Sequence, residues 1–133
     1  MTDIVTFSRV LGDETRWRIV RLAMQEALCV CELADILEMP QSSVSSHVQI
    51  IRKAGLLESE KREKWTYFRI DARHARLIAT LERFFEEDGS LPLWKDDLKK
   101  MNQRLEEREG SCCPGPIRLK SRAARNGSRS TCK

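Results

Sequence analysis

The chain has 133 residues, of which 41% are hydrophobic and 33% are charged, so it holds about one ordinary domain with a modest core. No apolar run approaches the roughly 18 residues that a membrane helix requires, and the first ten residues lack the basic cluster and cleavage pattern of a secretory signal. We therefore expect a cytoplasmic protein, neither a membrane protein nor a two-domain enzyme, whose five cysteines are thiols rather than disulfides.

The net charge of +4 is unevenly distributed. Residues 1–70 are neutral, residues 71–110 have a net charge of −2, and residues 111–133 have a net charge of +6. The positive charge thus lies in the tail, and the isoelectric point by itself does not argue for nucleic-acid binding. Only local sequence patterns can support that function.

Apolar residues at helical spacing predict three short helices before Pro40. The first covers residues 4–11, and Asp13 is placed to cap the second, which covers residues 14–27. The third covers residues 30–37, with apolar residues at i, i+3, i+4 and i+7, and the proline stops it.

A fourth helix begins after this proline and has the composition of a helix that contacts DNA. Val44, Val48 and Ile51 form one buried stripe, and no acidic residue lies between Met39 and Leu57. Small side chains that donate and accept hydrogen bonds can enter the major groove, and the lack of carboxylates avoids repulsion of phosphate. The residues suited to base edges are Gln41, Ser42, Ser43, Ser45, Ser46 and Gln49.

Extended structure is predicted next. Residues 56–61 and 64–70 are rich in aromatic and β-branched residues and flank a charged tip, which predicts a β-hairpin. Two short helices joined by a tight turn and followed by a basic hairpin form a winged helix-turn-helix. For His47, which lies beside the buried stripe, a structural hydrogen bond is as good an interpretation as a contact with DNA. The residues suited to phosphates or to the groove under the wing are His47, Lys53, Lys61, Arg62 and Lys64.

Two further helices are predicted after the hairpin. The one that begins at residue 71 or 72 has a wide apolar arc, so we expect it to have a second packing partner. The other covers residues 91–108, and the chain from Gly110 onward has the composition of a disordered tail. The expected organisation is a winged-helix DNA-binding and dimerisation domain at 1–88, an amphipathic helix at 89–109 and a basic tail with a vicinal cysteine pair at 110–133.

Cys29 and Cys31 form a second group of residues whose side chains could carry chemistry. Side chains two residues apart on an ideal helix diverge by about 200°, but this pair lies at a helix start, where the chain unwinds and the sulfurs can converge. The helix N-terminus favours thiolates, and thiolates select soft ions over Mg²⁺ or Ca²⁺. By itself the pair is weak support for a metal site, because buried cysteine is a common small hydrophobe.

Four segments together resemble the ArsR/SmtB family of bacterial metalloregulators: LGDETR at 11–16, LCVCEL at 28–33, QSSVSSHV at 41–48 and KWTYFRI at 64–70. The resemblance covers about residues 4–70, half of the chain. It implies an all-α fold with a small β-hairpin wing (α+β), assembled as a homodimer. It also implies a repressor that binds double-stranded operator DNA and leaves it when an ion binds.

The LCVCEL segment is similar to the arsenite and antimonite site of that family. The resemblance makes Cys29 and Cys31 ligands of an As(III) or Sb(III) inducer, with no constitutive cofactor. Ala34 stands where arsenite-responsive members often have a third cysteine. As(III) prefers three thiolates, and the candidates for the missing sulfur are Cys112 and Cys113, because some members carry a C-terminal vicinal pair in their arsenic site.

Other functions stay open beside this one. The segment also resembles the cadmium/lead-sensing branch, although no cysteine precedes Cys29 to supply that branch's N-terminal ligands. A winged-helix regulator that links thiols in response to oxidants is a further alternative. An interfacial zinc site is not expected, because Arg73 and Phe84 stand where imidazoles would be, and a thiol enzyme is not expected, because the chain has no C-x-x-C motif. Glu63 stands where the family usually has glycine, so we expect a wing turn of different shape.

Overall fold

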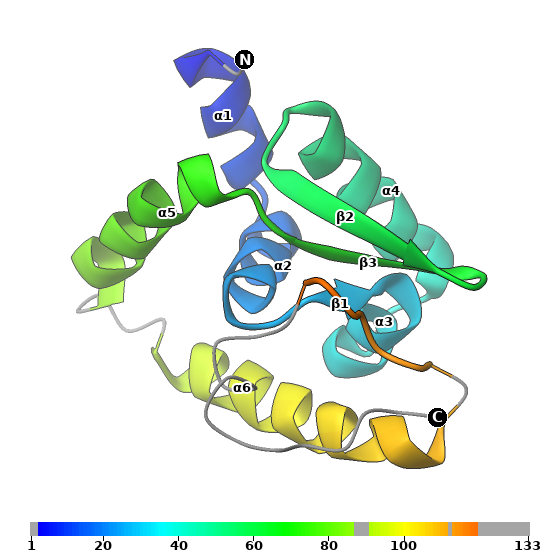
Figure 1. Cartoon of the computed structure of the whole chain (residues 1–133). Coiled ribbons are helices and arrows are strands. Elements are labelled where there is room, and N and C mark those ends of the chain that lie inside the picture. The colour runs from blue at the N-terminus through cyan, green and yellow to red at the C-terminus, as the bar shows by residue number, and fades with distance from the viewer. Residues whose placement is uncertain (1–2, 87–90, 112, 120–133) are drawn as a thin grey trace.

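The computed structural model describes residues 3–86, 91–111 and 113–119. Helices surround a small sheet, and α6 runs along the opposite side of the molecule from α1 (Figure 1). The elements are α1 (Ile4–Leu11), α2 (Glu14–Gln25), β1 (Leu28–Cys29), α3 (Val30–Leu37), α4 (Gln41–Lys53), β2 (Leu57–Arg62), β3 (Trp65–Ile70), α5 (Ala72–Phe85), α6 (Leu91–Glu106) and the 3-10 helix η2 (Glu107–Gly110). None of the helices described combines the length and apolar composition needed to span a bilayer.

The helix-turn-helix consists of α3 and α4. Val44, Val48 and Ile51 are fully buried, as predicted, in one core cluster with apolar residues of α2 and α3. Pro40 occupies the N-cap position of α4, and Gly55, with φ 83°, follows its C-terminus. Only glycine adopts this left-handed conformation without strain, so Gly55 ends the helix as a C-terminal glycine does.

The predicted hairpin is confirmed, and a third strand joins it. The antiparallel sheet has the order β1-β3-β2, with β2 and β3 in register from Leu57 opposite Ile70 to Arg62 opposite Trp65. The short strand β1 was not predicted, because two residues are too few to show a periodicity. At the hairpin turn, Glu63 adopts φ 57°. An L residue thus occupies the positive φ that glycine favours at this position of the turn.

The helix α6 packs against α2 and α3. Trp94, Met101 and Leu105 lie on the apolar side of this amphipathic helix and are buried in the main core cluster. A partly buried ion pair between Arg18 and Asp97 (Nη2 to Oδ1, 2.8 Å) also joins α6 to α2. The helix is therefore part of the same core as the winged helix.

Residues 113–119, which we call the C-terminal strap, differ from the predicted disordered tail. The strap passes beside β1 (Figure 1, orange), and Cys113 and Leu119 are buried in a small cluster with Tyr67. Hydrogen bonds to side chains of the sheet hold its backbone, which is why this proline- and glycine-containing stretch has a defined path. Residues 120–133 of the predicted tail lie outside the described residues.

Candidate thiol centre and DNA-contacting face

Three thiols converge at the start of α3. The Sγ atoms of Cys29 and Cys31 lie 3.0 Å apart, and Cys113 of the strap lies 3.0 Å from Cys31 and 3.8 Å from Cys29. No histidine or carboxylate among the described residues joins this cluster. Cys112, the other predicted ligand of the vicinal pair, lies outside the described residues. The three sulfurs form a set that could hold a soft metal ion.

Glu32 and Arg108 fix the backbone that presents the first two thiols. The backbone of Cys29 is extended (φ −92°, ψ 169°), and its N–H donates to Glu32 Oε1 at 3.1 Å. Glu32 is fully buried and accepts hydrogen bonds from Arg108 at 2.6 Å (Nε to Oε2) and 2.9 Å (Nη2 to Oε1). The departure from helical geometry at Cys29 lets the sulfurs of residues 29 and 31 meet, as the sequence predicted.

The three thiols differ in acidity. Hydrogen bonds, first from Cys29 and then from Cys113, lower the pKa of Cys31 to about 6. The same hydrogen bond to Cys31 raises the pKa of Cys29, and burial raises the pKa of Cys113 to about 11. Arg104 adds a positive charge, with Nη2 3.7 Å from Cys113 Sγ and Nε 2.8 Å from Asp35 Oδ2. The centre at neutral pH is one thiolate flanked by two thiols.

The sequence did not predict the residues that surround the thiols. Arg104 near the end of α6 and Arg108 in η2 are four residues apart, and both bind carboxylates of α3, Asp35 and Glu32 respectively. The signal that could have found them is the interruption of the apolar stripe beside Met101 and Leu105 by two arginines at helical spacing. Glu32 gave no signal, because a glutamate in a first helical turn is common without any further role.

A row of residues crosses the sheet from the thiol centre. Cys29 pairs with Tyr67, and Tyr67 pairs with Glu60, so the three side chains lie on the same face. The strap follows this row. The N–H of Gly115 donates to the Tyr67 hydroxyl at 2.8 Å, and the Glu60 carboxylate accepts the N–H groups of residues 117–119 at 2.8, 2.8 and 3.0 Å.

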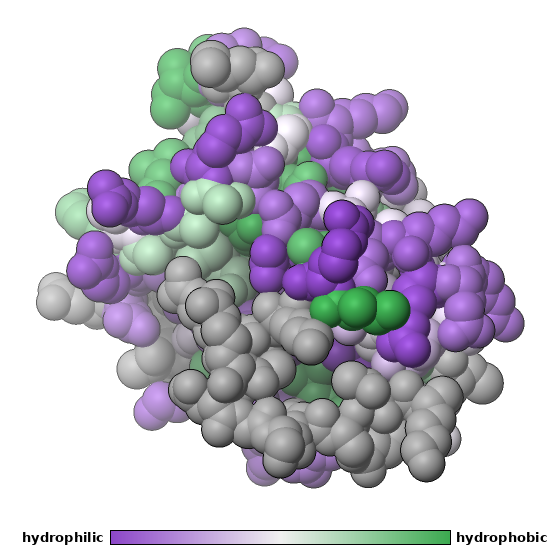
Figure 2. Space-filling view, viewed as in Figure 1, coloured by the Kyte–Doolittle hydropathy of each residue, from purple (hydrophilic) through white to green (hydrophobic). Residues whose placement is uncertain are grey.

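The predicted DNA-contacting residues lie on α4 and the wing. Ser42, Ser46, Gln49 and Lys53 are spaced at i, i+4, i+7 and i+11, so they lie on one face of α4. Figure 2 shows hydrophilic side chains gathered over α4 and the strands of the wing. The exposed members of the predicted set are Gln41, Ser42, Ser46, Gln49, Lys53, Lys61 and Lys64, and the half-buried members are Ser43, Ser45, His47 and Arg62.

His47 and Arg62 have partners within the chain. His47 Nδ1 lies 3.4 Å from Arg16 Nη1 and 4.0 Å from Asp13 Oδ2, both near the start of α2. Arg62 Nη1 donates to the carbonyl oxygens of residues 114 and 115 in the strap, at 3.1 and 2.7 Å. The structural hydrogen bond considered for His47 is therefore present, and the Arg62 guanidinium binds the strap.

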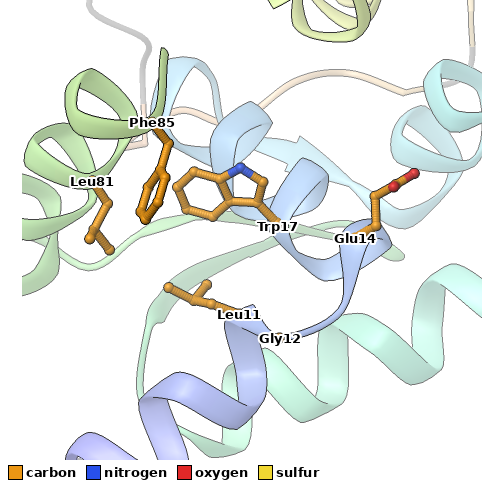
Figure 3. A pocket seen from close by; sticks show the side chains of 6 residues that line it. All are labelled: Leu11, Gly12, Glu14, Trp17, Leu81 and Phe85. Atoms are coloured by element: carbon orange, nitrogen blue, oxygen red, sulfur yellow. The ribbon is translucent and has the colours of Figure 1, made fainter. Parts of the chain in front are cut away.

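An apolar surface is left uncovered on α1 and α5. A pocket of about 280 Å³ lies where α1, α2 and α5 meet. In it, Phe85 of α5 lies between Leu81 and the Trp17 indole, and Leu11 of α1 lies below them (Figure 3). The large exposed apolar side chains on the two outer helices are Ile4, Val5, Leu77, Phe84 and Phe85.

Comparison of the sequence with known proteins finds transcriptional regulators. The profile described as "bacterial regulatory protein, arsR family" matches residues 13–59. An uncharacterized HTH-type transcriptional regulator of Methanocaldococcus jannaschii is 33% identical over 76 residues, which are 56% of this chain and 85% of that protein. The arsenical resistance operon repressor of Escherichia coli K12 is 40% identical over 63 residues, 47% of this chain and 54% of that repressor.

A cadmium relative matches over a similar length. The cadmium resistance transcriptional regulatory protein CadC homolog of Staphylococcus aureus is 29% identical over 77 residues, 57% of this chain and 64% of that protein. The match thus spans only about half to two thirds of the arsenical and cadmium relatives. The family profile covers Cys29 and Cys31, whereas Cys113 lies beyond it.

Solved structures share the fold. The homodimeric winged helix-turn-helix DNA-binding domain Mb0332 of Mycobacterium bovis has a TM-score of 0.60 at 24% identity, covering 65% of this chain and 82% of that one. The antimony-specific transcriptional repressor AntR has a TM-score of 0.53 at 28% identity, covering 63% of this chain and 77% of that one. The family and fold are those of DNA-binding transcriptional regulators, not of enzymes. The chain belongs to the arsR family of bacterial regulatory proteins.

Proposed function

We propose that this protein is a metalloid-responsive repressor that leaves its operator when As(III) or Sb(III) binds Cys29, Cys31 and Cys113. The observation that carries the proposal is the cluster of three thiols with no imidazole or carboxylate among the described residues. A three-coordinate ion needs no further ligand there, whereas structural Zn²⁺ is almost always four-coordinate. Relatives that bear the names of arsenical and antimony repressors support the same choice of ion.

The arrangement of the thiols suits ligand exchange with arsenite. Arsenite, As(OH)₃, can exchange its three hydroxyls for three sulfurs and release three waters. Cys31 supplies the first thiolate, because its pKa of about 6 leaves it ionised at neutral pH. Cys29 and Cys113 then release their protons to two of the departing hydroxyls, and the third hydroxyl takes its proton from solvent, so that three waters leave. The oxidation state of arsenic does not change.

Binding at the thiols would be coupled to the DNA-contacting helix through α3. Cys29 and Cys31 lie at the start of α3, whose apolar side chains share one core cluster with those of α4. An ion bound among sulfurs that are now 3.0–3.8 Å apart would reset the distances between them, and this would displace the first turn of α3 and with it α4. A coupling free energy of about 1–3 kcal/mol would change DNA affinity by about 5–150-fold.

A second copy of the chain would cover the apolar surface of α1 and α5. Two recognition helices must be held about 34 Å apart to enter successive major grooves, which requires a dimer. The M. bovis domain with the same fold is described as homodimeric. Phe84→Glu, at a residue 72% exposed, should give monomers that no longer bind DNA. Leu93→Glu on α6 is the matched control and should leave the sedimentation coefficient unchanged.

The proposal is tested by the fluorescence anisotropy of a labelled duplex from the protein's own promoter, bound by fully reduced protein. Arsenite, antimonite, cadmium and zinc are titrated in parallel. We expect release by arsenite or antimonite, and loss of that response in Cys29→Ser, Cys31→Ser and Cys113→Ser. Cys112→Ser and Cys132→Ser are the matched controls, and both should respond as the wild type does.

Three other results would contradict the assignment. Release by cadmium alone would make the protein a sensor of soft divalent ions, as the name of the S. aureus relative suggests. Release by oxidant without any ion would make it a thiol-redox regulator, since sulfurs 3.0 Å apart can also form a disulfide. Binding of DNA that no ion and no oxidant affects would remove the sensing function altogether.

A further inference from the structure

The C-terminal strap connects the thiol centre to the wing by a short segment of chain. Cys113 is the third thiol, and the next two residues accept hydrogen bonds from Arg62 through their carbonyl oxygens. Consecutive Cα atoms are only about 3.8 Å apart. An ion that holds the sulfur of Cys113 therefore also fixes the partners of Arg62.

The contact uses an arginine that would otherwise be available to DNA. Arg62 is the last residue of β2, beside the tip of the hairpin, where a winged helix approaches the DNA backbone. Its Nη1 lies 2.7 Å from the Gly115 carbonyl oxygen. The two strap carbonyls take up Nη1 and hold the guanidinium against the strap.

The remaining strap contacts hold the same segment on the sheet. Glu60 accepts three successive backbone N–H groups of the strap, and its own side chain is buried. The Tyr67 hydroxyl accepts the N–H of Gly115 at 2.8 Å. Each of these side chains lies in the row that begins at Cys29. The strap is thus fixed at one end by the thiol centre and along its length by the wing strands.

We propose that the strap is a ligand-dependent latch, which takes Arg62 away from DNA when Cys113 binds the ion together with Cys29 and Cys31. This inference rests on the proposed function and adds a second route by which the ion lowers DNA affinity, through the wing. The arrangement described is the closed latch. Without the ion, the contacts with the sheet alone must offset the conformational entropy that is lost when residues 113–119 become ordered. Because coupling is reciprocal, bound DNA weakens ion binding by the same factor.

The test compares two isosteric variants of β2. Glu60→Gln removes the charge that holds the strap, while Glu58→Gln removes a carboxylate of the same strand that pairs with Arg69 instead. We expect arsenite to lower the operator affinity of the wild type and of Glu58→Gln by the same factor, and that of Glu60→Gln by a factor several-fold smaller. Tyr67→Phe, which deletes only the hydroxyl that binds Gly115, should behave as Glu60→Gln does. Arsenite binding, followed by thiolate–arsenic absorbance, should persist in all of them.

Arg62→Ala tests the DNA end of the latch. Without arsenite, this variant should bind the operator more weakly, and its slope of log affinity against log salt should be less steep by about 0.9. Arsenite should then release it by a smaller factor than it releases the wild type. Amide hydrogen exchange gives a readout independent of DNA: arsenite should slow exchange at residues 115 and 117–119.

The outcomes separate the latch from the sensing function. If arsenite releases the wild type and all variants by one factor, the latch is wrong and the repressor proposal stands. Equal exchange rates of the strap amides with and without arsenite would likewise overturn it. If arsenite neither binds nor releases the wild type, both proposals fail together.

Discussion

Arg108 of η2 forms a buried ion pair with Glu32 of α3, with 2.6 Å between Nε and Oε2. Glu32 also accepts the backbone N–H of Cys29, and Arg108 also donates to the carbonyl oxygen of Ala27 at 2.7 Å. One guanidinium thus ties the C-terminal end of α6 to the residue before β1 and to the start of α3. The geometry of the first two thiols depends on a residue 76 positions away from Glu32 in the chain.

Arg108→Met should destabilise the fold strongly. Removing one partner of a buried ion pair leaves an uncompensated charge, at a cost of about 3–5 kcal/mol. Arg73→Met is the matched control, since Arg73 pairs with Asp71 at the surface and such pairs contribute about 0–1 kcal/mol. Urea unfolding measures both changes. The double variant Arg108→Met/Glu32→Met should recover part of the loss, and a loss of under 1 kcal/mol in the single variant would contradict this account.

Cys31 should be the thiol that reacts first at neutral pH. Since hydrogen bonds from Cys29 and Cys113 lower its pKa to about 6, its alkylation by iodoacetamide should reach half of its maximal rate near pH 6. Burial holds the pKa of Cys113 at about 11, so that thiol should react only at high pH. Peptide mass spectrometry separates the two sites.

The same pKa shift has a consequence for stability. The pKa of Cys31 is lower in the folded protein than in the unfolded chain, so its thiolate stabilises the fold above the unfolded pKa, and this contribution disappears as the pH falls through about 6. Cys29→Ala removes the main hydrogen bond and should move the alkylation midpoint toward the ordinary value. A wild-type midpoint at about 8.5, the value of a free cysteine, would refute the assignment.

Glu63→Gly should stabilise the protein. Glu63 has φ 57° at the first position of the two-residue hairpin loop, and an L residue in this conformation is strained by about 1–2 kcal/mol. Glycine relieves that strain but loses more entropy on folding, which leaves a net gain of roughly 0.5–1 kcal/mol. Thermal unfolding measures it. Lys64→Gly, at the neighbouring position without a positive φ, should instead lower the melting temperature.

His47→Gln should reduce stability without changing the electrostatics of DNA binding. The ring contacts Arg16 and Asp13 at the start of α2 instead of facing solvent fully. We expect a loss of about 0.5–1.5 kcal/mol in unfolding free energy, as for one hydrogen bond, and an unchanged salt dependence of operator affinity. In contrast, Lys53→Ala should make the salt slope less steep by about 0.9. An equal change of slope in His47→Gln would place that ring on a phosphate.

The sequence by itself determined the winged helix. The stripe at Val44, Val48 and Ile51 and the aromatic and β-branched hairpin strands are local patterns with a helical or an extended period, and local periodicity is what a sequence expresses directly. The approach of the Cys29 and Cys31 sulfurs at a helix start is also local, since it depends only on these two residues and on the backbone conformation at the N-cap of the helix. Neighbouring residues alone are therefore sufficient to predict these features.

Only the tertiary structure decided which thiol completes the centre and what the arginines do. Cys113 reaches Cys31 across 82 residues of chain, and the contact exists because α6 packs on α3 and returns the chain to the sheet. Arg62 looked like a wing residue for DNA, yet its hydrogen bonds go to the strap. No sequence periodicity encodes such contacts, because they arise when separate helices and strands pack together. The local pattern of each element is compatible with many ways of packing it against the others.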